Sequence, residues 1–130
     1  MRLEKVTPTP EETRQIFIEA FGEYDESFLP QHVLYVYDND ERVAFCSVYP
    51  HSVGTLYLQY IGFLKGVQKK YLYYKQTIEA LHQLGFPFIM GTISNNNTVA
   101  IMWALRSGFK IIGARQASNG ELFVEILRRY

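Results

Sequence analysis

The chain has 130 residues, of which 48% are hydrophobic, and its 13 basic and 13 acidic side chains cancel. This length supports one sizeable core, so we expect a single domain over residues 1–130. Charge neutrality argues against a general affinity for nucleic acid or for anionic membranes. The sequence shows no signal peptide, no apolar run that could span a bilayer, and one cysteine, Cys46, which excludes an internal disulfide. We therefore expect a cytoplasmic protein with no membrane partner.

The first half of the chain predicts one helix among four strands. Residues 2–7 alternate weakly as a strand, and Thr9, Pro10 and Glu12 then form a capping box with proline in the first turn. The helix that follows is expected to end at Gly22. Runs rich in β-branched and aromatic residues predict three more strands, the first two joined by a turn at 38–41: residues 32–37, 42–49 and 55–63.

The second half alternates helices and strands. A helical period over residues 71–84 ends at Gly85, and a helix over 98–107 ends before Gly108. Strands are expected at 86–93, 110–115 and 121–128. The helix at 71–84 should act as a crossover that makes strand 86–93 parallel to strand 55–63. The predicted fold class is α/β (α+β), a mixed and mostly antiparallel sheet of about seven strands with helices on both faces.

The segment from Asn97 to Phe109, NTVAIMWALRSGF, carries the most information about function. Asn97 is a good N-cap and Gly108 a good helix stop, as they would be in any capped helix. The order of Asn97, Ala100 and Gly108-Phe109 behind a strand resembles the N-x-x-A…G-F segment of the GCN5-related N-acetyltransferases, the GNAT family. The order of elements resembles that fold over almost the whole chain, with the family's second helix reduced to a loop or one turn near residues 27–31.

This resemblance implies an acyl-CoA-dependent N-acyltransferase that transfers acetyl from acetyl-CoA, its co-substrate, to a primary amine by direct attack. Acetyl-CoA would lie between strands 55–63 and 86–93, which splay apart in the family after a bulge. Backbone groups of Ile61, Gly62 and Phe63 would pair with the pantetheine arm, and Asn97 would reach the same arm. Gly62 suits a bulge or a close backbone approach, or it is a glycine required by packing.

The phosphate loop departs from the family pattern. With Gln68 at the first position, the two positions that normally hold small residues fall on Tyr71 and Tyr73. Lys65, Lys69 and Lys70 nevertheless gather where a helix should begin, and an anion bound there would offset their repulsion from the helix dipole. The predicted phosphate site comprises Gly66, Val67, Gln68, Lys69, Lys70 and Tyr71, and the alternative is a solvated lysine cluster.

Catalytic groups do not follow from the resemblance. Strand 55–63 has no Asp or Glu, and the family's tyrosine position on the last helix holds Ala104. Tyr57, Tyr60 and Ser94 are the candidates for orienting water or donating a proton, although ten tyrosines in a small domain make structural roles the default. The histidines at 32, 51 and 82 lack the spacing of a metal site, so no metal is predicted.

A cluster of carboxylates suggests the acceptor. Glu23, Tyr24, Asp25 and Glu26 would attract a cationic amine, either a small molecule or a peptide, or they form an ordinary solvated loop. A homodimer is compatible with the sequence. The alternative class of function is a catalytically inactive GNAT-like protein that acts as a binding or interaction module, which the residues Tyr71, Tyr73 and Ala104 favour.

Overall fold

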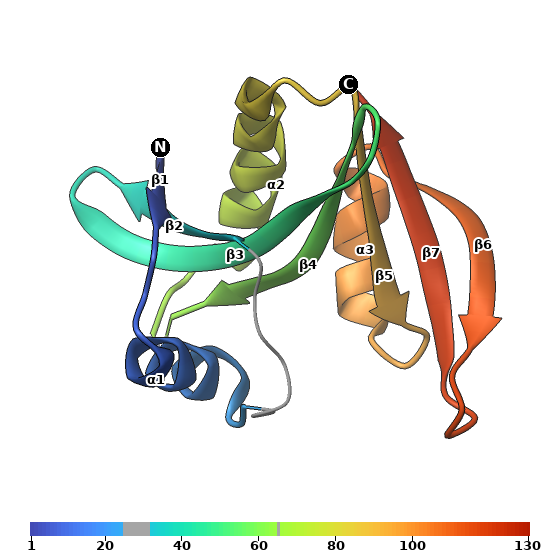
Figure 1. Ribbon diagram of the computed structural model, residues 1–130, viewed down its shortest axis with the longest axis horizontal. Coiled ribbons are helices and arrows are strands. Elements are labelled where there is room, and N and C mark those ends of the chain that lie inside the picture. The colour runs from blue at the N-terminus through green and yellow to red at the C-terminus, as the bar shows by residue number, and fades with distance from the viewer. Residues whose placement is uncertain (25–31, 65) are drawn as a thin grey trace.

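A seven-stranded sheet with helices on both faces makes up the protein (Figure 1), as a computed structural model of residues 1–24, 32–64 and 66–130 shows. The strand order is β1-β2-β3-β4-β5-β7-β6, parallel only between β4 and β5. The predicted α/β fold and its parallel crossover are thereby confirmed. The elements are β1 (Arg2–Val6), α1 (Pro10–Phe21), β2 (His32–Asp38), β3 (Glu41–Ser52), β4 (Thr55–Phe63), α2 (Lys70–Leu81), a 3-10 turn η1 (His82–Leu84), β5 (Phe88–Ser94), α3 (Thr98–Arg106), β6 (Lys110–Gln116) and β7 (Leu122–Arg129).

Helix α1 covers one half of one sheet face. Its predicted capping box is present, because Thr9 Oγ1 accepts a hydrogen bond from the Glu12 amide while Glu12 Oε1 accepts one from the Thr9 amide, each at 3.1 Å. Gly22 ends the helix in the left-handed region at φ 83°. The apolar stripe of α1 packs on β2 and β3, where Phe17 lies 4.9 Å from the Phe45 ring. The predicted start and stop of this helix are confirmed.

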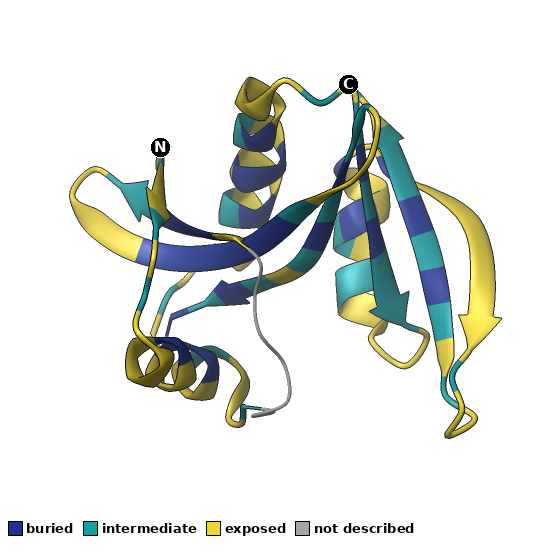
Figure 2. Ribbon diagram, viewed as in Figure 1, coloured by how far each residue is buried: buried dark blue, intermediate teal, exposed yellow. Residues whose placement is uncertain are grey.

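Helices α2 and α3 cover the opposite face. Their buried side chains, among them Ile78 and Ala104, pack on inward residues of strands from β2 to β7, such as Cys46 and Ile126. Helix α2 is shorter than predicted, since it gives way to the 3-10 turn η1 before Gly85. On the α1 face the strands β5 and β7 keep a row of partly exposed side chains (Figure 2), and β6 is exposed along its length.

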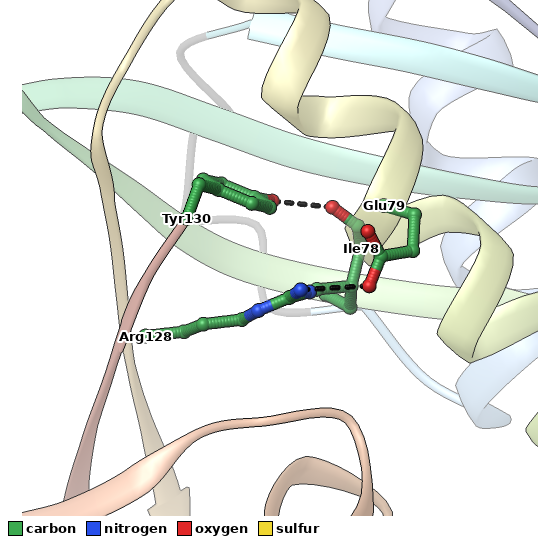
Figure 3. A network of polar contacts seen from close by, with 4 residues as sticks. All are labelled: Ile78, Glu79, Arg128 and Tyr130. Atoms are coloured by element: carbon green, nitrogen blue, oxygen red, sulfur yellow. Dashed lines mark hydrogen bonds and ion pairs between the residues drawn. The ribbon is translucent and has the colours of Figure 1, made fainter.

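The C-terminus fastens β7 to α2 (Figure 3). The Tyr130 hydroxyl donates to the backbone oxygen of Ile78, and the Arg128 guanidinium forms an ion pair with Glu79 at 2.7 Å. The Tyr130 ring also stacks on His82 with centroids 4.4 Å apart. These contacts join β7 to the crossover helix α2. The same end of β7 pairs with Phe88, where β5 begins its pairing with β4.

This attachment should weaken at alkaline pH. Burial raises the pKa of Tyr130 to about 12, and only the neutral phenol can donate to the Ile78 oxygen. Its contribution to stability is therefore complete below the unfolded-state pKa of about 10 and is lost as pH rises through the folded-state value. Urea unfolding between pH 9 and 12 should show a steeper loss of stability in wild type than in Tyr130→Phe. Identical slopes for the two proteins would contradict this assignment.

Candidate functional site

The sheet opens between β4 and β5. Their parallel register runs from Thr55 opposite Phe88 to Leu58 opposite Gly91 and then stops, so the two strands diverge toward their C-terminal ends (Figure 1). Beyond Leu58, the edge of β4 that faces β5 pairs with no strand among the residues that the structure describes. Unpaired strand edges offer backbone donors and acceptors to a bound chain. The opening therefore provides a place for an extended ligand within the sheet.

A bulge in β4 marks where the opening begins. Ser47 pairs with Tyr60 and Val48 pairs with Leu58, which leaves Gln59 as an extra residue opposite β3. The fully buried Ser47 hydroxyl donates to Gln59 Oε1 at 2.7 Å and satisfies both groups. This contact fixes the position of the bulge.

Gly62 does not form the bulge, which lies three residues earlier. A Cβ atom at Gly62 would lie 2.8 Å from Phe45 Cε1 and 2.9 Å from both Ala20 Cβ and Phe21 Cζ. Real Cβ atoms do not approach other atoms so closely, so any larger residue would force these side chains or α1 to shift, and glycine allows the close packing of α1 on β4. The suggestion of a bulge at Gly62 is wrong, and the packing alternative describes the residue correctly.

A cleft of about 540 Å³ occupies the opening. Both diverging strands, the start of α3 and the end of α1 line it, and five of the predicted site residues meet there: Tyr57, Tyr60, Ile61, Ser94 and Asn97. Gly62 and Phe63 do not line it, because Gly62 faces α1 and the Phe63 ring packs edge-on against Trp103 at 6.1 Å. Gln59 and Thr92 line the cleft without having been singled out in the sequence.

Asn97 caps α3 at the rim of the cleft. Its Oδ1 accepts a hydrogen bond from the Ala100 amide at 3.1 Å, and its own amide donates to the Ser94 oxygen at 2.9 Å. The predicted capping role is confirmed. The side chain also lines the cleft, so the contact with a cofactor stays a prediction.

Replacing Asn97 by alanine should affect both stability and ligand binding. We expect a loss of about 1 kcal/mol in the free energy of unfolding, because the first turn of α3 loses its cap, together with weaker acetyl-CoA binding. Thr9→Ala is the matched control, since it removes the cap of α1 far from the cleft. Urea unfolding and calorimetric titration of both variants separate the two roles. Unchanged acetyl-CoA affinity in Asn97→Ala would leave the residue as a cap alone.

The N-terminus of α2 is suited to an anion. Lys69 precedes the helix in a left-handed conformation at φ 56°, its side chain makes no capping hydrogen bond, and the first turn contains no acidic residue. Uncapped amides and the positive end of the helix dipole attract anions. Lys69 and Lys70 are exposed beside these amides, and the Arg106 guanidinium of α3 lies 6.0 Å from the Tyr71 ring. Lys65 lies outside the described residues.

The two tyrosines in the degenerate phosphate loop have other contacts. The Tyr71 ring lies against Trp103 with centroids 6.2 Å apart, which directs it toward α3. The Tyr73 hydroxyl donates to Oδ2 of Asp38 at the end of β2, at 2.7 Å, and this hydrogen bond raises the pKa of Tyr73. Both rings therefore serve packing between elements. Their backbone amides stay in the first turns of α2.

Hydroxyl groups from β4 and β5 meet in the cleft. Tyr57 Oη and Thr92 Oγ1 share a hydrogen bond of 2.6 Å across the point where the strands separate. Ser94 Oγ donates to Glu121 Oε1 at 2.8 Å, which brings a carboxylate from the β6–β7 connection to the rim. Tyr60 packs its ring on Phe17 of α1 at 5.5 Å. The sequence pattern does not indicate Thr92 or Glu121, because their hydrogen-bond partners lie 35 and 27 positions away in the chain.

The predicted acceptor segment is only partly described. Glu23 is exposed, and the Tyr24 ring packs edge-on against Phe17 at 5.2 Å, within the cluster beneath α1. Asp25 and Glu26 lie outside the described residues, as does the turn predicted near residues 27–31. Selection of a cationic amine by this segment therefore stays a prediction.

Two further properties concern the described residues alone. None of their helices is both long and apolar enough to cross a membrane. Across residues 1–24, 32–64 and 66–130, no three His, Cys, Asp or Glu side chains come together as metal ligands.

Comparison with known proteins identifies the fold. No protein-family model matches the chain, and no curated protein is similar to it in sequence. Among solved structures, an acetyltransferase from Bacillus subtilis in complex with CoA superposes with a TM-score of 0.75 at 17% identity, covering 99% of this chain and 98% of the other. A GNAT family acetyltransferase from Elizabethkingia anophelis with acetyl-CoA bound gives 0.74 at 12% identity, with 99% and 97% coverage.

The ribosomal-protein-S18-alanine N-acetyltransferase from Escherichia coli gives a TM-score of 0.70 at 15% identity, covering 98% of this chain and 94% of that one. Such identities establish a shared fold and leave the activity to be argued from the site. The similarity to these three structures extends over 98–99% of this chain. The protein therefore has the fold of the GNAT acetyltransferases.

Proposed function

We propose that the protein is an acyl-CoA-dependent N-acyltransferase that transfers an acetyl group from acetyl-CoA to a primary amine. The observation that carries this proposal is the opening of the sheet after Leu58, with a cleft of about 540 Å³ at the diverging strands. The structures from Bacillus subtilis and Elizabethkingia anophelis, which have the same fold, were solved with CoA or acetyl-CoA bound.

The chain offers groups for each part of such a co-substrate. The unpaired edge of β4 from Gln59 to Phe63 can pair its backbone groups, including those of Ile61, with the amides of a pantetheine arm. Asn97 lies at the rim of the same cleft. The uncapped N-terminus of α2, with Lys69 and Lys70, fits the phosphates. Arg106 adds a positive charge from α3 beside this helix.

Acetyl-CoA supplies an acetyl group already activated as a thioester. The lone pair of the amine nitrogen forms the new C–N bond, the C–S bond breaks, and the amine loses one proton while the departing thiolate gains one. A β4 backbone amide in the cleft would polarise the thioester carbonyl. The cleft residues that could take part in these proton transfers are Tyr57, bonded to Thr92, Ser94, bonded to Glu121, and Tyr60.

A second candidate is a catalytically inactive binding module with the same fold. Ala104 is fully buried and stands where the family places a phenol, which favours this alternative. The cleft and the cationic helix terminus serve both candidates equally, because they concern binding. The two differ in whether acetyl transfer follows.

Acetyl transfer to a panel of amines tests the proposal. We expect thiol release that depends on both acetyl-CoA and a primary amine, with the acetylated product identified by mass spectrometry. Cationic amines should react faster than neutral ones if the predicted segment from Glu23 to Glu26 contributes. Binding of acetyl-CoA without transfer to any amine would support the binding module. Absence of acetyl-CoA binding would contradict the enzymatic function and would leave an interaction module that acts through a partner surface.

A further inference from the structure

A second pocket adjoins the cleft on the face that α1 leaves uncovered. It has a volume of about 230 Å³ and shares Tyr49, Tyr57 and Thr92 with the cleft. Tyr49 and Tyr57 stack with ring centroids 5.1 Å apart, and His51 lies 5.7 Å from Tyr57. The three rings are tilted relative to one another, and the two tyrosines offer aromatic surface against which a methylene chain can pack.

Two opposite charges line the other side of this pocket. Glu125 lies in the middle of β7, opposite Gly113 of β6, and Arg115 follows two residues further along β6. Gly113 leaves the flank of Glu125 open, since a Cβ there would meet nothing within 4 Å.

Neither charge is neutralised within the described part of the chain. The Arg115 guanidinium lies over the Phe123 ring, 6.0 Å from its centroid, and it forms no ion pair with Glu125. The Glu125 carboxylate has no hydrogen-bond partner among residues 1–24, 32–64 and 66–130. A ligand that carries both an ammonium and a carboxylate would satisfy both groups through charge-assisted hydrogen bonds.

Glu125 lies one strand away from the cleft residue Thr92. Glu125 pairs with Thr92 of β5, and Thr92 in turn bonds the Tyr57 hydroxyl at the opening of the sheet. Neighbouring strands are separated by ~4.8 Å. A short methylene chain that starts at Glu125 and passes the Tyr57 ring therefore reaches the place where β4 and β5 separate.

We propose that the amine acceptor is a free diamino acid of the lysine or ornithine type. Its α-ammonium pairs with Glu125, its α-carboxylate pairs with Arg115, and its methylene chain lies along Tyr49 and Tyr57. The terminal amine then enters the cleft and receives the acetyl group, so that an amide forms, the C–S bond of acetyl-CoA breaks, and CoA and a proton are released. The proposal rests on the proposed function. A diamine would satisfy Glu125 alone, and a lysine within a peptide would satisfy neither charge.

Four acceptors tested against two variants examine this assignment. The acceptors are lysine, cadaverine, which lacks the carboxylate, 6-aminohexanoate, which lacks the α-amine, and Nα-acetyl-lysine amide, which lacks both charges. Wild type should prefer lysine over each of the others by about tenfold or more in kcat/KM, mainly through KM. Arg115→Ala should weaken use of lysine and 6-aminohexanoate and spare cadaverine. Glu125→Gln should weaken use of lysine and cadaverine and spare 6-aminohexanoate.

Matched controls remove the same charges elsewhere. Lys110→Ala takes a positive charge from the same strand β6 outside the pocket, and Asp40→Asn takes a negative charge from the β2–β3 turn. Both should keep the wild-type order of acceptors. Equal use of all four acceptors by wild type, or equal weakening of all four by either variant, would overturn the assignment and leave acetyl transfer itself intact.

A binding measurement separates this proposal from the proposed function. Calorimetric titration of lysine into the protein saturated with CoA should show binding that Arg115→Ala and Glu125→Gln each weaken about tenfold or more. Such binding without any acetyl transfer would support the pocket and contradict the enzymatic function. Absence of lysine binding to wild type would overturn the pocket assignment.

Discussion

Charge reversal at Lys69 and Lys70 should weaken acetyl-CoA binding at least about tenfold at low ionic strength. Each substitution removes a cation and places a carboxylate at the uncapped N-terminus of α2, where the helix dipole and free amides attract an anion. The difference between wild type and the double variant should shrink as salt is added, because salt screens exposed charges. Isothermal titration at two salt concentrations measures both effects.

Lys75→Glu provides the control for this experiment. Lys75 is exposed on the same helix but lies beyond its first turn. The substitution changes the charge of α2 without placing a carboxylate at its N-terminus, so acetyl-CoA affinity should stay close to that of wild type. An equal loss of acetyl-CoA affinity in Lys75→Glu and in the double variant would mean that the overall charge of the protein, and not a site at the N-terminus of α2, accounts for the effect. Unchanged affinity in the double variant would remove the phosphate assignment.

Gly62→Ala should lower the free energy of unfolding by about 1–3 kcal/mol, the usual cost of overpacking a core. The added methyl group would meet Phe45, Ala20 and Phe21 at less than 3 Å, so α1 must shift away from β4. Because Phe21 lines the cleft, this shift should also weaken acetyl-CoA binding. Urea unfolding monitored by circular dichroism measures the first effect, and calorimetry the second.

Gly113→Ala is the matched control for Gly62→Ala. Gly113 also lies in a strand, but a Cβ there would meet no atom within 4 Å. Its replacement should leave the free energy of unfolding nearly unchanged. Similar losses at both positions would show that the conformational freedom of glycine, rather than contact with α1, accounts for the effect.

Local signals in the sequence predicted the elements well. The capping box from Thr9 to Glu12, the left-handed stop at Gly22 and the cap at Asn97 each depend on residues within four positions of one another, so the sequence alone identifies them. The crossover that makes β4 and β5 parallel follows from the order of elements. The position of a cleft between these two strands was implied by the resemblance to the GNAT family.

The sequence pattern did not predict contacts between residues that are distant in the chain. The bulge lies at Gln59 because Ser47, on the neighbouring strand, bonds its side chain, and no glycine marks this arrangement. Glu125 lines the pocket beside the cleft because β7 inserts between β5 and β6, an order that hydrophobic periodicity does not encode. The Tyr71 ring lies against Trp103, a contact 32 positions away in the chain that the phosphate-loop pattern does not encode. In each case the deciding partner is remote in the chain.

Isothermal titration of the wild-type protein with acetyl-CoA tests the central claim most directly. The account predicts saturable binding of acetyl-CoA to one site per chain. Added salt should weaken this binding, and reversing the charges of both Lys69 and Lys70 should also weaken it. The titration contains no acceptor, so the result does not depend on knowing the acceptor. Absence of saturable binding at millimolar acetyl-CoA to correctly folded protein would contradict the account.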